Sequence, residues 1–133
     1  MFGTYKVVSS ENVSEFQALA KPGWINNYLE ENSLLTSEQV TFTYENGFIH
    51  EQWAHGLMLK YVLNNPISFK GLEGEEVVMS AFMAGTTLTL VNSDGFGNEI
   101  VTERIFSDKG MEQATFLRRG GVKAVRKFKK ISH

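Results

Sequence analysis

The sequence contains no cysteine, which excludes a disulfide framework and thiolate chemistry. It has only 2 prolines, and no apolar run approaches the roughly 18 residues of a membrane-spanning helix. A net charge of -2 lacks the basic excess that is typical of nucleic-acid-binding proteins. The opening residues lack the apolar segment of a secretory signal. We therefore expect one domain over residues 1–133, a cytoplasmic location and no nucleic-acid partner.

Turn signals recur along the chain at short intervals. Dipeptides such as Asn46-Gly47, Asp94-Gly95 and Gly120-Gly121 separate short runs rich in Val, Ile, Thr, Phe and Tyr. Asn-Gly and Asp-Gly supply the positive φ angles of tight hairpins, and strands at this spacing predict a sandwich or a barrel. Short connections favour an up-and-down meander. The expected strands are residues 4–9, 37–45, 48–54, 57–63, 67–71, 76–83, 86–92, 98–106, 111–118 and 122–131.

A helical segment interrupts this pattern after the first predicted strand. Asn12 and Glu15 have the spacing of a capping box at the start of a short helix, and Pro22 ends that helix. A second helix is predicted from Trp24 to Glu31, with Asn32 as its C-cap. Two helices this short cannot form a second layer, but they could cap one end of a barrel.

The predicted last strand carries an arginine on its apolar face. Because alternate residues of a strand face the same way, Ala124, Arg126 and Phe128 share one face, and the opposite face carries three lysines. Arg104 lies among apolar neighbours in an earlier predicted strand. A guanidinium group keeps its charge in proteins, so an arginine in the interior needs an anion.

Two sources of that anion stay open from the residues alone. A ligand carboxylate would fit the guanidinium fork with two parallel hydrogen bonds. An internal acidic side chain would serve equally, and Glu99, Glu103 and Glu112 are nearest in the sequence. The alternation of polar and apolar residues likewise leaves open whether the strands enclose a cavity or form a packed sandwich.

Three stretches of the sequence resemble the intracellular fatty acid-binding proteins. These are the opening "MFGTYKVVSSENVSEF", the middle "NNPISFKGLEGEE" and the ending "VRKFKKIS". The resemblance covers the whole chain and implies an all-β fold. The implied architecture is a ten-stranded antiparallel up-and-down barrel, capped by a helix-turn-helix between the first and second strands.

The same resemblance implies a ligand site. Arg126 matches the arginine of the family's Arg-x-Tyr ending and Arg104 matches its second arginine, so both are expected to hold a ligand carboxylate. Phe16 and Phe128 are expected to line the ligand pocket. Phe128 replaces the tyrosine of the family pattern, which removes one hydroxyl from the site. The stretch from Trp53 to Asn64 is longer than is usual near the family's portal.

The expected function is a non-enzymatic intracellular carrier of a long-chain fatty acid or similar ligand, acting as a monomer with transient membrane contact. Alternatives are a retinoid binder, a lipid-modifying enzyme or a membrane-docking protein on the same barrel. We expect no cofactor, and no catalytic residue because the sequence singles out no nucleophile and base, and no pair of carboxylates, aimed at one point. We also expect no metal, because the spacing of His50 and His55 in a predicted strand does not suit a zinc site. The resemblance favours a cavity-lining position for His50 and Gln52; a solvent-facing position is the alternative.

Overall fold

The computed structural model describes residues 1–31, 34–56, 58–70 and 74–132. Predicted and observed strand ends agree within two residues. The elements are β1 (Gly3–Glu11), α1 (Val13–Leu19), α2 (Gly23–Glu31), β2 (Gln39–Glu45), β3 (Phe48–Trp53), β4 (Leu59–Tyr61), β5 (Ile67–Lys70), β6 (Glu76–Ala84), β7 (Thr87–Ser93), β8 (Glu99–Phe106), β9 (Gly110–Leu117) and β10 (Ala124–Ser132).

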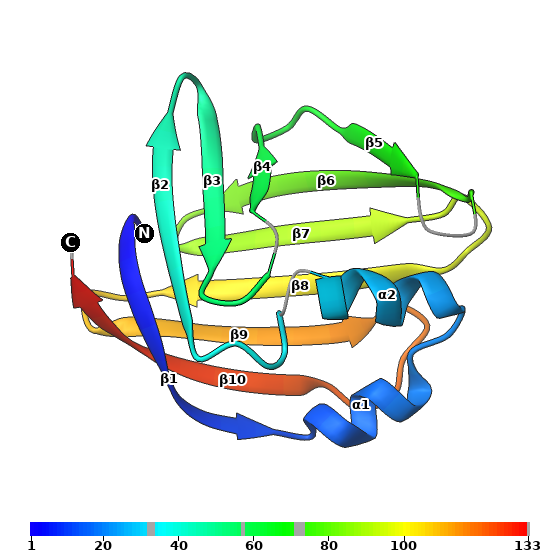
Figure 1. Cartoon of the computed structure of the whole chain (residues 1–133), viewed down its shortest axis with the longest axis horizontal. Helices are drawn as coiled ribbons and strands as arrows, with labels where there is room; N and C mark the ends of the chain where they lie inside the picture. The colour runs from blue at the N-terminus through cyan, green and yellow to red at the C-terminus, as the bar shows by residue number, and fades with distance from the viewer. Residues whose placement is uncertain (32–33, 57, 71–73, 133) are drawn as a thin grey trace.

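The ten strands form one antiparallel sheet that curls into a nearly closed barrel (Figure 1). Their order is β4-β3-β2-β1-β10-β9-β8-β7-β6-β5, so the first and last strands are paired and every other hydrogen-bonded neighbour is also a neighbour in sequence. The edge strands β4 and β5 are connected through an isolated bridge between Val62 and Asn65. The predicted all-β up-and-down barrel is therefore confirmed.

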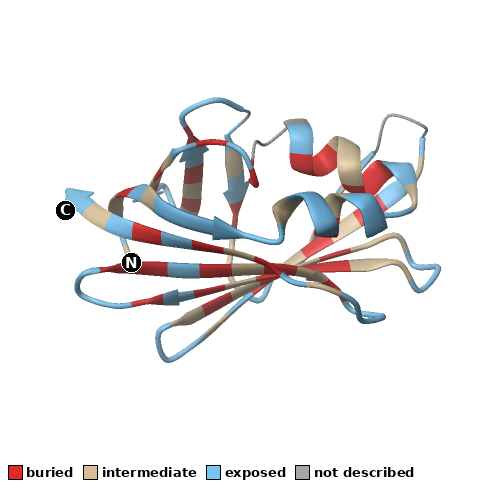
Figure 2. Cartoon of the chain, turned by 90° about the horizontal axis from the view of Figure 1, so that it is seen from below, coloured by how far each residue is buried: buried red, intermediate tan, exposed pale blue. Residues whose placement is uncertain are grey.

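Both helices lie side by side at the end of the barrel where β1 ends and β10 begins (Figures 1 and 2). The indole of Trp24 in α2 donates to Asp94 in the turn between β7 and β8, at 3.1 Å. Arg119, between β9 and β10, donates to the carbonyls of Leu19 and Lys21 at 3.0 and 2.9 Å. These contacts attach the helical cap to two turns of the barrel. Neither described helix is long and apolar enough to cross a membrane.

The predicted capping box at the start of α1 is wrong. Asn12 is the N-cap residue, but it has left-handed backbone angles, φ 60° and ψ 22°, and its side chain makes no capping hydrogen bond. An N-cap side chain normally bonds to the helix from an extended backbone, and the left-handed conformation of Asn12 departs from that geometry. The predicted C-cap of α2, Asn32, lies outside the described residues.

Strand alternation is correct in β10 and wrong in β3. In β10, Ala124, Arg126 and Phe128 are buried, as predicted. In β3 the buried positions are Ile49, Glu51 and Trp53, whereas Gln52 is exposed and His50 is half-buried. The expectation that His50 and Gln52 line the interior is therefore reversed, because a one-residue change of parity moves every side chain to the other face.

The end of the barrel away from the helices is filled by aromatic rings. Tyr5, Phe42 and Phe106 contact one another edge-on or nearly so, with ring centroids 5.5–5.8 Å apart. All three are buried, and the Tyr5 hydroxyl donates to the Met1 carbonyl at 2.7 Å. Such ring pairs contribute beyond their buried area. The interior is therefore packed with side chains at this end.

Gly110 provides a stability test of the packing of β9 on β10. A Cβ at this position would overlap the backbone carbonyl of Phe128, whereas a Cβ at Gly23 meets nothing within 4 Å. We expect Gly110→Ala to lower the free energy of unfolding by about 1–3 kcal/mol, because backbone atoms must move to admit the methyl group. Urea denaturation measures the change. Gly23→Ala is the control, and an equal loss in both variants would contradict the assignment.

Candidate functional site

Two arginines and a glutamine lie at one level on the inner wall of the barrel. Arg126 on β10 is paired in register with Gln113 on β9, which is paired with Arg104 on β8. Residues opposite each other on paired strands share a face of the sheet. Arg104 and Gln113 have no exposed surface, and Arg126 has 3%. Both predicted arginines are therefore in the interior, separated by one polar side chain.

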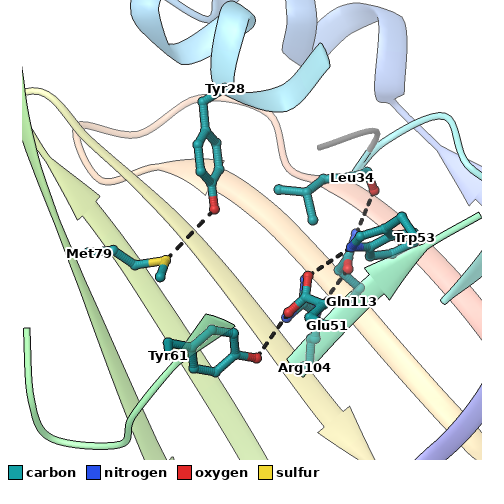
Figure 3. Close-up of polar contacts among 8 residues, drawn as sticks. All are labelled: Tyr28, Leu34, Glu51, Trp53, Tyr61, Met79, Arg104 and Gln113. Atoms are coloured by element: carbon teal, nitrogen blue, oxygen red, sulfur yellow. Dashed lines mark hydrogen bonds and ion pairs between the residues drawn. The ribbon is translucent and has the colours of Figure 1, made fainter. Parts of the chain in front are cut away.

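Arg104 forms a bidentate ion pair with Glu51 of β3 (Figure 3). Its two terminal nitrogens donate to the two carboxylate oxygens at 2.7 and 2.8 Å. Its Nε donates to Oε1 of Gln113 at 3.0 Å. Parallel hydrogen bonds of this kind combine charge with a specific geometry. The guanidinium of Arg104 thus already has a carboxylate partner.

Two aromatic side chains complete the surroundings of the Glu51 carboxylate. The Trp53 indole donates to Oε2 at 2.8 Å, and the Tyr61 hydroxyl donates to Oε1 at 2.9 Å. Both rings are almost completely buried. With the two bonds from Arg104, the carboxylate accepts four hydrogen bonds, so the buried negative charge is well compensated.

This ion pair crosses the interior of the barrel. In the sheet, β3 and β8 are separated by β2, β1, β10 and β9, so Glu51 and Arg104 extend from different parts of the wall. The two residues are 53 positions apart in the sequence. Sequence reasoning considered an internal partner for the arginine but did not name Glu51. The available signal was an acid between two apolar alternate residues, Ile49 and Trp53.

The acidic residues that the sequence offered lie elsewhere. Glu99 pairs with Arg118 at 2.6 Å, and these side chains are 29% and 61% exposed. Glu112 is exposed and Glu103 is half-buried on the alternate face of β8 from Arg104. Proximity in sequence therefore did not identify the partner of the buried cation.

Burial and charge change the pKa values in this cluster. Burial acts to lower the pKa of Arg104, but the adjacent Glu51 carboxylate outweighs it and the net shift is upward. Burial and the Glu51 carboxylate raise the pKa of Tyr61 well above its usual value. The arginine thus remains a cation and the tyrosine a neutral donor at physiological pH.

Arg126 has a different set of partners, and those among the described residues are neutral. Its terminal nitrogens donate to the carbonyls of Leu34 and Ser37 at 3.0 and 2.8 Å, and its Nε donates to the Ser10 hydroxyl at 3.1 Å. Leu34 and Ser37 belong to the connection between α2 and β2. The Leu34 carbonyl also accepts from Nε2 of Gln113 at 3.1 Å.

No carboxylate of the described residues forms an ion pair with Arg126. Burial without a counter-ion lowers the pKa of Arg126 to about 10, which still leaves it charged at neutral pH. Its guanidinium carbon lies 5.1 Å from the centroid of the Phe128 ring and 6.0 Å from that of Trp53. Within the described residues, Arg104 therefore has an internal anion and the partners of Arg126 are neutral.

The two predicted pocket residues are both in the core. Phe16 of α1 has no exposed surface and Phe128 has 4%. The Phe128 ring packs edge-on against Trp53, with centroids 5.8 Å apart. The Phe128 ring therefore contacts both Arg126 and the Trp53 indole that donates to Glu51. Contact of Phe16 and Phe128 with a ligand stays a prediction.

Known structures share this architecture over almost the whole chain. A fatty acid-binding protein from the brain of Drosophila melanogaster aligns with a TM-score of 0.71 and 20% identity, covering 97% of this chain and 99% of that one. A Schistosoma mansoni fatty acid-binding protein in complex with arachidonic acid aligns with a TM-score of 0.67 and 20% identity, covering 98% of this chain and 96% of that one. The fluorescent protein UnaG aligns with a TM-score of 0.73 and 18% identity, covering 98% of this chain and 97% of that one.

These likenesses establish the fold. No family model matches the sequence, and no curated protein matches it. At identities of 18–20% the shared feature is the ten-stranded barrel with its helical cap. The chain thus has the fold of the intracellular fatty acid-binding proteins, as the sequence resemblance predicted.

The buried ion pair makes a testable contribution to stability. We expect Glu51→Gln to lower the free energy of unfolding by about 3–5 kcal/mol, because Arg104 is left as a buried charge without its counter-ion. The double variant Glu51→Gln/Arg104→Met should regain part of this loss, because it contains no unpaired charge. Chemical denaturation monitored by tryptophan fluorescence measures both.

A surface pair provides the control for that experiment. Glu99→Gln breaks the exposed pair with Arg118 and should cost less than about 1 kcal/mol. If the Glu51 and Glu99 variants lose the same stability, the buried pair is not the stabilising constraint described above.

Proposed function

We propose that this chain is a non-enzymatic carrier that binds a long-chain fatty acid, or a similar hydrophobic monoanion, inside the barrel. The observation that carries the proposal is Arg126, a buried cation that has only neutral partners among the described residues. A ligand carboxylate would supply the missing negative charge, in the geometry that a guanidinium binds best.

The wall near Arg126 supports a ligand with an apolar tail. Between the arginine level and the helical end, β6 to β9 contribute buried apolar side chains to the interior; they include Met79, Ala81, Leu90, Ile100 and Leu117. Burial of a methylene group yields about 0.8 kcal/mol. A tail of about 16 carbons therefore offers roughly 12 kcal/mol before ordering costs, which leaves ample affinity for a carrier.

The proposal covers residues 1–133 as one intracellular lipid-binding domain that acts as a monomer. Phe16 and Phe128 contact the ligand, and Arg126 holds its carboxylate. The resemblance also assigned Arg104 to the ligand carboxylate, but its guanidinium is already bound by Glu51, so the proposal places the head group at Arg126. A carrier returns its ligand unchanged, whereas a lipid-modifying enzyme would require a nucleophile and a base aimed at one point.

Displacement of a fluorescent fatty acid measures the proposed activity. We expect the probe to gain fluorescence on binding and to be displaced by oleate, because both compete for Arg126 and the same apolar wall. Mass spectrometry of the recovered oleate should find it unmodified. Failure of every long-chain acid, retinoid and bile salt to displace the probe would exclude an interior lipid site.

The role of Arg126 is tested by comparing an acid with the matching alcohol. Arg126→Gln should weaken binding of palmitate by about 1.5–3 kcal/mol, because a hydrogen bond to a charged group is lost. Binding of hexadecanol should change much less. Isothermal titration calorimetry measures both affinities.

Lys127→Gln is the matched control for charge. Lys127 is the next residue in β10 and is exposed, so its substitution removes a positive charge from the outer surface. Equal losses for acid and alcohol in the Arg126 variant would assign the arginine to packing rather than to the ligand.

A further inference from the structure

The two arginines on the inner wall lie at the same level of the sheet but have hydrogen-bond partners of different charge. Arg104 and Arg126 flank Gln113 at the same level of the barrel. Arg104 donates two hydrogen bonds to the Glu51 carboxylate, while Arg126 donates to two carbonyls and a hydroxyl. An entering anion would therefore meet one cation that is neutralised by Glu51 and one that has no counter-ion among the described residues.

Glu51 is held in place against displacement. Besides its two bonds to Arg104, its carboxylate accepts hydrogen bonds from Trp53 and Tyr61, and all four residues are 0–1% exposed. A ligand carboxylate at Arg104 would have to approach a second carboxylate within the same low-dielectric interior, where like charges repel strongly. It would also leave Glu51 buried without its cation, which is unfavourable.

Arg126 presents a smaller obstacle to the same ligand. A carboxylate there would replace the carbonyls of Leu34 and Ser37, which are neutral acceptors. Hydrogen bonds to a charged acceptor are stronger than those to a neutral one. The exchange at Arg126 therefore leaves no buried charge unpaired, whereas the exchange at Arg104 would leave Glu51 without its cation.

We propose that Glu51 determines ligand specificity: it occupies Arg104 as an internal counter-anion, so that the barrel accepts a single monoanionic head group, at Arg126. This inference rests on the proposed lipid-binding function and adds to it the charge class and the location of the head group. Glu51 acts through Arg104 and is not required to touch the ligand.

The test measures how strongly each variant prefers palmitate to hexadecanol. In Glu51→Gln, Arg104 is released, and we expect the preference for the acid to rise by about 10-fold or more, the scale of an added charge-assisted hydrogen bond. In Glu51→Gln/Arg104→Gln the preference should return to the wild-type value. A merely structural role of Glu51 would weaken acid and alcohol together and would leave their ratio unchanged.

Glu112→Gln is the matched control, because it removes a carboxylate from an exposed position on β9. Its ratio of acid to alcohol affinity should equal that of the wild type. An increase as large as that of Glu51→Gln would attribute the effect to net charge and overturn the inference.

A measurement on the wild-type protein covers the case in which Glu51→Gln fails to fold. In ¹⁵N-resolved NMR spectra of the arginine Nε–H groups, palmitate should shift the Arg126 resonance and leave that of Arg104 in place. A large shift of Arg104 with none of Arg126 would overturn the inference while preserving the lipid-binding function. If neither palmitate nor hexadecanol binds to the wild type or to a folded variant, both proposals are wrong.

Discussion

The ion pair between Glu51 and Arg104 is the interaction on which the organisation of the interior depends. Removing two charges from water is costly, and their attraction offsets that cost only when the remaining hydrogen-bonding capacity is satisfied. The carboxylate meets this condition through Arg104, Trp53 and Tyr61, and the third nitrogen of the guanidinium is bound by Gln113. Because β3 and β8 are distant in the sheet, the pair also connects separate parts of the barrel wall.

This pairing makes the interior electrically asymmetric. One arginine is neutralised by the protein, and the pKa of the other is lowered by burial among neutral partners. A buried cation without a counter-ion among the described residues would favour an anionic ligand over a neutral one of the same shape.

The connection between α2 and β2 links the unmatched cation to the helical cap. Its Leu34 carbonyl accepts from both Gln113 and Arg126, and its Ser37 carbonyl accepts from Arg126. At the same end of the barrel, Trp24 attaches α2 to the turn at Asp94. An anion at Arg126 would therefore accept hydrogen bonds from the same guanidinium nitrogens that now bind the Leu34 and Ser37 carbonyls. Binding of a head group would thus compete with the contacts that hold this connection against the barrel wall.

Local chemistry determined most of the architecture of this protein. Asn46-Gly47 adopts the positive φ angles, 54° and 84°, that a tight hairpin needs, and the alternation around Arg126 correctly predicted a buried arginine. Alternation alone does not show which face of a strand points inward. The resemblance favoured the interior for His50 and Gln52, whereas Glu51 is the buried residue. Only the closed barrel decided that Glu51 meets Arg104, 53 residues away, and that no acid in the described part of the chain forms an ion pair with Arg126. Strand propensity and turn geometry depend on neighbouring residues, but the partner of a buried charge depends on which walls the closed sheet brings face to face.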